Sequence, residues 1–275
     1  MSIPTLSFED LNQRDPLSFA KILNRSDIFE RDSNQHTKIR SDLPGLVVSF
    51  ARAGFFGAPD LAALAVILRR IAEEGKPVTI NWPRSSKGQP SELEKYLERL
   101  RFADLFERKA GSSDWRERVH IQGRAELKHY PPDPHETTHY IPLHWFDKND
   151  FLLVGEASIW KERPSVKPAV ERDLHLVLLQ QGFADIETID ILNRVLFLEL
   201  GFNTVLHAAV NPGAGCGVFC TQIRHEDKRP PSLTFCIADA GRGIPSTLRS
   251  AFEKAVKEGE KERPKARSRM LKAEC

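Results

Sequence analysis

A long helical pattern between Asp185 and Ala209 carries polar side chains within an otherwise apolar surface. Apolar residues recur on several sides of the segment, as in a largely buried helix, and Asp185 is a suitable N-cap. Glu199, Asn203 and His207 follow one another at intervals of four residues, so they form one stripe along the helix. A buried carboxylate needs a partner. The stripe therefore indicates either a ligand site or a hydrogen-bond network between the helix and a sheet.

The segment that follows this helix predicts a β-hairpin that leads into a glycine-containing turn. Residues 217–223 and 232–237 have the composition of strands and are separated by a polar turn. The second strand runs into Asp239, which is followed by Gly241 and Gly243. Glycine lets a ligand approach the backbone closely. The pattern thus predicts Asp239 at a strand end, where its carboxylate is able to accept a hydrogen bond from a ligand.

Taken in this order, the two motifs resemble those of the GHKL ATPases, which include histidine kinases, gyrase B and anti-sigma-factor kinases. Residues 199–208 are similar to the N-box, with a spacing of Glu, Asn and His closest to the anti-sigma-factor serine kinases. Residues 239–244 are similar to the first glycine box. The resemblance implies a Bergerat-type α/β sandwich over residues 166–275 that binds ATP and Mg²⁺.

The resemblance also implies a role for each site residue. Asp239 would accept a hydrogen bond from the adenine amino group, and the two glycines after it would shape the adenine pocket. Asn203 would be a ligand of Mg²⁺, a cation that prefers oxygen ligands. Glu199 would be the general base for phosphoryl transfer. For His207 two alternatives stay open, a contact on the phosphate side of the nucleotide and simple packing.

The residues after the first glycine box determine which activity we expect. Residues 245–275 contain no Gly-x-Gly-x-Gly motif, so we expect the domain to be truncated and to lack the family's second glycine box. The expected function is an ATP-binding regulatory or signalling protein that hydrolyses ATP or phosphorylates protein Ser or Thr if its pocket is completed. Two alternatives stay open: a non-catalytic protein-interaction module with a vestigial nucleotide pocket, and an ATPase switch that closes as a homodimer. The expected partners are ATP and a protein of unknown identity.

The N-terminal half predicts a separate α/β unit over residues 41–110, because strand and helix patterns alternate there. Residues 46–50 and 77–82 have the composition of buried strands. A helical pattern begins at Pro59, a residue favoured in the first turn of a helix. A second helix is predicted to begin at the capping box formed by residues 91–94.

This alternation resembles the STAS domain, the fold of anti-sigma-factor antagonists. That family carries a phosphorylatable serine in the loop before the first helix, but residues 57–60 of this chain contain no hydroxyl group. We therefore expect a docking or scaffold role without a phosphorylation switch. Residues 1–40 are expected to form an N-terminal arm. Residues 111–165, which are interrupted by prolines and hold several histidines, are expected to form a linker.

The composition excludes several classes of partner. The chain has 275 residues and a formal net charge of +2, so its overall charge favours neither nucleic acid nor an anionic membrane. No apolar run approaches the roughly 18 residues that a membrane-spanning helix needs. The four cysteines lack the spacing of a metal site and are expected to be buried reduced thiols. A cytoplasmic protein is therefore expected.

Overall fold

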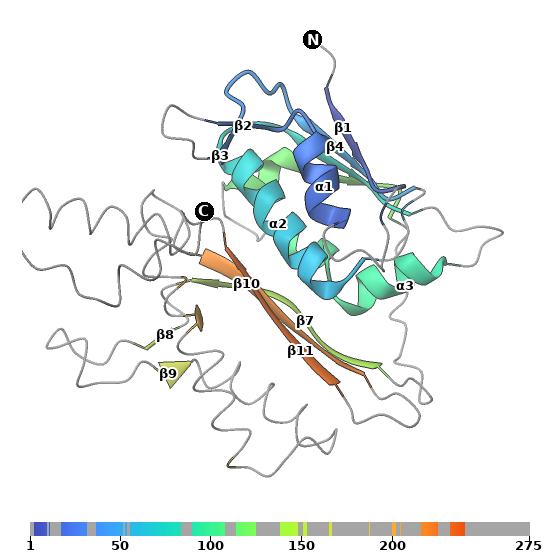
Figure 1. The fold of residues 1–275 in the computed structure, drawn as a ribbon, viewed down its shortest axis with the longest axis vertical. Coiled ribbons are helices and arrows are strands. Elements are labelled where there is room, and N and C mark those ends of the chain that lie inside the picture. The colour runs from blue at the N-terminus through green and yellow to red at the C-terminus, as the bar shows by residue number, and fades with distance from the viewer. Residues whose placement is uncertain are drawn as a thin grey trace, which may run out of the picture.

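The computed structural model is a mixed α/β protein in which a parallel and an antiparallel sheet lie on either side of helix α2 (Ala58–Glu73; Figure 1). The antiparallel strands are drawn in green and orange below the helix in this view, and the parallel strands lie behind and above it. The structure describes residues 3–9, 11, 18–31, 37–51, 53, 56–83, 90–107, 114–124, 138–147, 151–152, 165–166, 187, 200–201, 204, 216–224 and 232–239.

The parallel sheet has four strands in the order β1-β4-β5-β6. They are β1 (Thr5–Ser7), β4 (Leu46–Ser49), β5 (Val78–Asn81) and β6 (Val119–Gln122). In β4 and β5 the first and third residues are buried and the others are half-buried, which is the two-residue periodicity of a strand. Helix α2 connects β4 to β5 as a crossover between parallel neighbours. The two strands predicted at residues 46–50 and 77–82 are confirmed.

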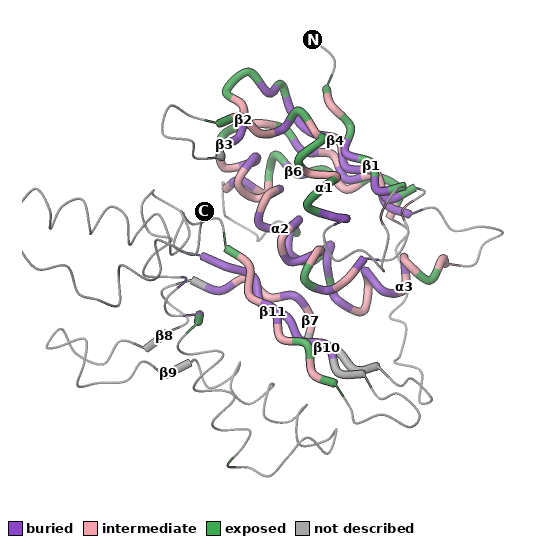
Figure 2. Tube along the Cα trace, viewed as in Figure 1, coloured by how far each residue is buried: buried purple, intermediate pink, exposed green. Residues whose placement is uncertain are grey.

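Helix α2 has buried residues in every turn, and partly exposed residues lie between them (Figure 2). Pro59 lies in its first turn, and Asp60 Oδ2 accepts a hydrogen bond from the Gly57 amide at 3.1 Å, which satisfies a donor left over at the helix start. Its apolar residues contact β5 on one side and β10 and β11 on the other. A helix with apolar residues on several sides belongs between two layers, and that is where α2 lies.

The remaining helices are short. Helix α3 (Glu92–Arg99) begins at the predicted capping box, in which Ser91 Oγ accepts from the Glu94 amide at 3.1 Å and Glu94 Oε2 accepts from the Ser91 amide at 3.3 Å. Burial raises the pKa of the Glu94 carboxyl, and the hydrogen bond from Ser91 acts against this rise. The other helices are α1 (Ser18–Arg25), η1 (Ala103–Phe106) and η2 (Trp115–Arg118).

Two further pairs of strands are short. Strand β2 (Phe29–Arg31) pairs with β3 (Thr37–Ile39), and β8 (Phe151–Leu152) pairs with β9 (Ser165–Val166), both antiparallel. None of the helices in the described part of the chain is both long and apolar enough to cross a membrane.

The antiparallel sheet has three strands in the order β11-β10-β7. They are β7 (Thr138–Asp147), β10 (Cys216–Arg224) and β11 (Ser232–Asp239). Strands β10 and β11 pair over their whole length, from Gly217 opposite Asp239 to Arg224 opposite Ser232. This pairing confirms the hairpin predicted from residues 217–223 and 232–237.

Strand β7 contains a β-bulge at a proline. Its register with β10 shifts between Phe219 and Thr221, where β7 has one residue more than β10. Pro142 lies in this interval, and a proline is tolerated at a bulge because it has no N–H to give to the sheet. The amide of the next residue, Leu143, donates to Leu100 O at 2.9 Å, just beyond α3. The bulge thus joins the antiparallel sheet to the N-terminal half of the chain.

The parallel sheet extends beyond residues 41–110 at both ends. Strand β1 comes from the predicted N-terminal arm, and β6 comes from the predicted linker. Strand β7 also falls within residues 111–165 and belongs to the same sheet as the hairpin. The prolines of this stretch led to the prediction of a linker, but the proline inside β7 is accommodated by the bulge rather than ending the strand.

The ends of α2 and α3 offer a paired test of backbone conformation. Both helices end in the same pattern of amide-to-carbonyl hydrogen bonds, with a left-handed residue just after the helix: Gly75 at φ 84° and Arg101 at φ 53°. A Cβ added at Gly75 would meet nothing within 4 Å, so substitution there tests backbone strain alone.

We expect Gly75→Ala to lower the free energy of unfolding by about 1 kcal/mol, because the left-handed conformation penalises a Cβ. Arg101→Gly is expected to have the opposite sign and to raise that free energy by up to about 1 kcal/mol, since it relieves the same penalty at a greater loss of chain entropy. Urea unfolding measures both changes. Effects of the same sign at the two positions would contradict this account.

Candidate functional site

Helix α2 docks on the antiparallel sheet through an aromatic and cationic cluster, which we name the Arg69 cluster: Arg69, Trp115 and Trp145. The Arg69 guanidinium lies 4.8 Å from the ring centre of Trp145 and 5.2 Å from that of Trp115. Glu73, one turn along α2, holds Arg69 in place at 2.7 Å. An arginine that contacts a buried ring and a half-buried ring, with its charge paired, helps to fix the helix and the sheet in one relative position.

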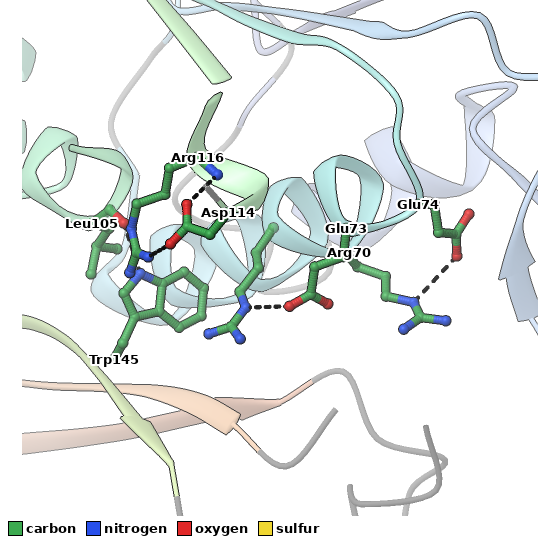
Figure 3. Close-up of polar contacts among 8 residues, drawn as sticks. Arg70, Glu73, Glu74, Leu105, Asp114, Arg116 and Trp145 are labelled. Carbon is green, nitrogen blue, oxygen red and sulfur yellow. Dashed lines mark hydrogen bonds and ion pairs between the residues drawn. The ribbon is translucent and has the colours of Figure 1, made fainter. Parts of the chain in front are cut away.

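Trp145 also links the antiparallel sheet to η1 (Figure 3). Its indole Nε1 donates to the carbonyl of Leu105 at 2.9 Å, so a residue of β7 is bound directly to η1. The ring lies edge-on to Trp115, with 5.7 Å between ring centres. The Arg116 guanidinium lies 4.5 Å from the ring centre of Trp115 and is paired with the Asp114 carboxylate.

The N-terminus of α2 faces two cysteines of the hairpin. Cys220 on β10 and Cys236 on β11 are opposite each other in the strand register, and Cys220 Sγ lies 3.8 Å from Ala58 O. Burial raises the pKa of the Asp60 carboxyl, and the hydrogen bond from Gly57 offsets part of this rise. Asp60 in turn acts to raise the pKa of Cys236. The start of α2 is therefore covered by the hairpin.

Asp239 is the last residue of β11 and is exposed. It lies opposite Gly217, the second residue of β10, so the carboxylate lies at the open end of the hairpin. Its place at a strand end is as predicted from the sequence. Gly217 itself is closely surrounded, because a Cβ there would lie 2.9 Å from Ala238 O and closer still to the Phe146 ring. The backbone next to Asp239 is thus tightly fixed.

The other predicted site residues lie outside the described residues. They are Glu199, Asn203 and His207 of the predicted helix, and Gly241 and Gly243 of the predicted glycine box. Within residues 185–209 the structure describes only four positions, and Glu187, Gly201 and Thr204 among them are helical. Gly201 and Thr204 are buried, whereas Glu187 and Leu200 are exposed.

No family model, curated protein or solved structure matches this chain. The likeness to GHKL ATPases therefore rests on the stripe at residues 199–207 and on the motif at residues 239–244. The likeness to STAS domains rests on the order of strands and helices in residues 41–110.

Among the residues that the structure describes, no three His, Cys, Asp or Glu side chains lie close enough together to hold a metal ion. His139 and His144, which the sequence placed in a linker, are both in β7. His144 is half-buried and stacks on Phe219 of β10, with 5.4 Å between ring centres. That histidine packs within the sheet instead of lying on an exposed linker.

The carboxyl edge of the parallel sheet is where ligands bind in many α/β proteins, so it is a second candidate site. Its described residues include Phe50 and Trp82, which follow β4 and β5 and contact each other with 6.4 Å between ring centres. Arg124, just beyond β6, makes two 2.8 Å bonds to Glu98 and lies 5.7 Å from the centre of the Trp82 ring. Aromatic packing and ion pairs thus occupy this part of the edge.

The Arg69 cluster was not predicted from the sequence. The pattern of the predicted helix did not single out Arg69, and Trp145 fell in the predicted linker. One signal was available, because residues 138–147 combine several aromatic residues with Ile141, a composition typical of a strand. Trp115 carried no signal for the cluster, since its partners there, Arg69 and Trp145, are distant in the sequence.

Proposed function

We propose that the C-terminal part of the chain, residues 166–275, binds ATP with Mg²⁺ in the manner of a GHKL domain. Asp239 recognises the adenine amino group, and Gly241 and Gly243 form the wall of the adenine pocket. Asn203 is a ligand of the Mg²⁺ that accompanies the phosphates, and Glu199 is the general base for phosphoryl transfer. The observation that carries the proposal is the position of Asp239, exposed at the end of a paired strand and directly before the two glycines.

The arrangement of the hairpin supports an adenine contact at Asp239. The backbone of Asp239, at the end of β11, is held by the pairing of that strand with β10 along its whole length. The tight surroundings of Gly217 restrict the neighbouring backbone. An acceptor that is fixed before the ligand arrives loses little conformational entropy on binding, which favours selective recognition of an amino group.

We further propose that the N-terminal half regulates or scaffolds this domain without a phosphorylation switch of its own. The residues at the head of α2 offer no hydroxyl, and Ala58 is buried beneath Cys220 of β10. A kinase would have no acceptor oxygen to reach there. The extensive contact of α2 with β10 and β11 instead supports a fixed, docked arrangement.

ATP binding tests the proposal directly. We expect calorimetry with ATP and Mg²⁺ to show binding that is weakened about tenfold or more in Asp239→Asn, because a hydrogen bond to a charged group contributes about 1.5–3 kcal/mol. GTP should bind more weakly than ATP to the wild-type chain, since guanine presents a carbonyl oxygen where adenine presents the amino group. The Asp239→Asn variant should show a smaller difference between its affinities for ATP and GTP.

Asp42→Asn is the matched control. Asp42 is an exposed carboxylate in the N-terminal half that pairs with Arg40 at 2.8 Å, so its loss should leave nucleotide affinity unchanged. Equal binding of ATP by the wild type and Asp239→Asn would remove adenine recognition from this residue. Absence of ATP binding at millimolar concentration in the folded wild type would favour the non-catalytic interaction module instead.

A further inference from the structure

The hairpin of β10 and β11 brings together two thiols in a geometry suited to a disulfide. Cys220 and Cys236 are directly opposite in the antiparallel register. Opposite residues in such a pair have Cα atoms about 4.5 or 5.5 Å apart, and both values fall within the range of about 4.4–6.8 Å that disulfides use. Both side chains belong to the core cluster on the side of the sheet that α2 covers, so both point to the same face.

The two sulfurs differ in their surroundings. Cys236 keeps 7% of its surface exposed, whereas Cys220 is fully buried. The Cys220 thiol holds the pKa of Cys236 below its usual value, although burial and the Asp60 carboxyl act in the other direction. The hydrogen bond between the thiols and burial raise the pKa of Cys220. Cys236 is therefore the thiol that keeps some exposure to solvent and ionises first, and Cys220 lies beside it as the second thiol.

We propose that Cys220 and Cys236 form a redox-active pair that a hydroperoxide converts to a cross-strand disulfide in the folded protein. The Cys236 thiolate attacks one oxygen of hydrogen peroxide, the O–O bond breaks, and the released hydroxide takes up a proton as water. The Cys220 sulfur then attacks the sulfenic acid on Cys236, forms the S–S bond and releases a second water. Two thiols lose two electrons and two protons, and one peroxide becomes two waters.

Cys216 provides a natural comparison within the same strand. It is also 7% exposed, and it lies four residues before Cys220, so it is on the same side of β10. Its partner on β7 is Asp147, not a cysteine. At about 3.4 Å per residue, its Cα is too far along the strand from that of Cys220 to be bridged. Cys236 and Cys216 are therefore equally buried, and they differ in that only Cys236 has a thiol, that of Cys220, directly opposite it.

The test is to treat the folded full chain with hydrogen peroxide, alkylate the remaining thiols and identify linked peptides by mass spectrometry. We expect one cross-link, between Cys220 and Cys236, lighter by two hydrogens and reversed by dithiothreitol. The oxidised chain should also melt several degrees higher, because the bond closes a loop in the unfolded state. Cys216→Ser should form the cross-link at the wild-type rate.

Two further variants keep the result decisive if one of them folds poorly. Cys220→Ala should leave a sulfenic acid at Cys236 that a dimedone reagent labels, and Cys236→Ser should leave Cys220 roughly tenfold or more less reactive than Cys236 is in the wild type. Persistence of both free thiols in the folded wild type would overturn the proposal. It would also be overturned by a cross-link that forms only in denaturant, or by one that joins Cys216 instead.

Discussion

In a protein whose pocket is completed by a second glycine box, replacing Glu199 with glutamine is expected to lower the turnover of ATP by about 10²–10⁴-fold, the usual effect of losing a general base. Glutamine keeps the size of the side chain but is unable to take a proton from the attacking water or hydroxyl. Affinity for ATP should change little, because the proposed role of Glu199 is to activate the attacking group and not to hold the adenine. The measurement is steady-state ATP hydrolysis, or transfer to a Ser or Thr acceptor, beside a binding isotherm for the same preparation.

Asn203→Ala is the companion variant. It removes a proposed ligand of Mg²⁺, so it should weaken binding of ATP in the presence of Mg²⁺ and have little effect in its absence. If Glu199 and Asn203 only satisfy a buried network, both variants should instead melt early by similar amounts. A Glu199→Gln protein whose folded fraction turns over ATP at the wild-type rate would rule out the general-base assignment.

Trp145→Ala is expected to lower the free energy of unfolding by about 3 kcal/mol, at the lower end of the range for removing a large aromatic side chain because Trp145 is half-buried. The variant loses the bond to Leu105 O, the contact with the Arg69 guanidinium and the ring contact with Trp115. Urea unfolding measures the change. Hydrogen exchange of the α2 amides provides a second reading, because the helix should open more easily once its contact with β7 is lost.

Two variants separate the contributions of Trp145. Trp145→Phe keeps a ring but has no donor for the Leu105 carbonyl. It should lower the free energy of unfolding by about 1–3 kcal/mol, the penalty of one unsatisfied buried acceptor. Arg69→Met keeps the aliphatic stem on the two rings, removes the cation and leaves Glu73 without its 2.7 Å partner. A Trp145→Ala protein within about 0.5 kcal/mol of the wild type would show that the cluster does not hold the two sheets together.

The elements that follow local rules were predicted well. Residues 46–50 and 77–82 alternate as strands do, residues 91–94 form their capping box, and the hairpin before Asp239 is present. These features depend on neighbours in the sequence, namely side-chain periodicity and the hydrogen bonds that caps and hairpins make locally.

The contacts that depend on distant partners were not predicted. The proline in β7 looked like an interruption, and only the shift in register with β10 shows that it sits at a bulge. Strand β6 is recognised as the edge strand of the parallel sheet only from its pairing with β5, which is distant in the sequence. The candidate site divides in the same way. The strand-end position of Asp239 is a local feature, whereas convergence with Glu199 and Asn203 depends on tertiary packing.

The position of α2 between two sheets has a consequence for synthesis on the ribosome. The helix and β5 emerge early, so the side of α2 that faces β5 is covered soon after translation. The other side stays uncovered until β10 and β11 have been made, roughly 10–30 s later at translation rates of about 5–20 residues per second. During that interval the nascent chain presents an apolar helix face, a surface that chaperones bind and through which unfinished chains aggregate.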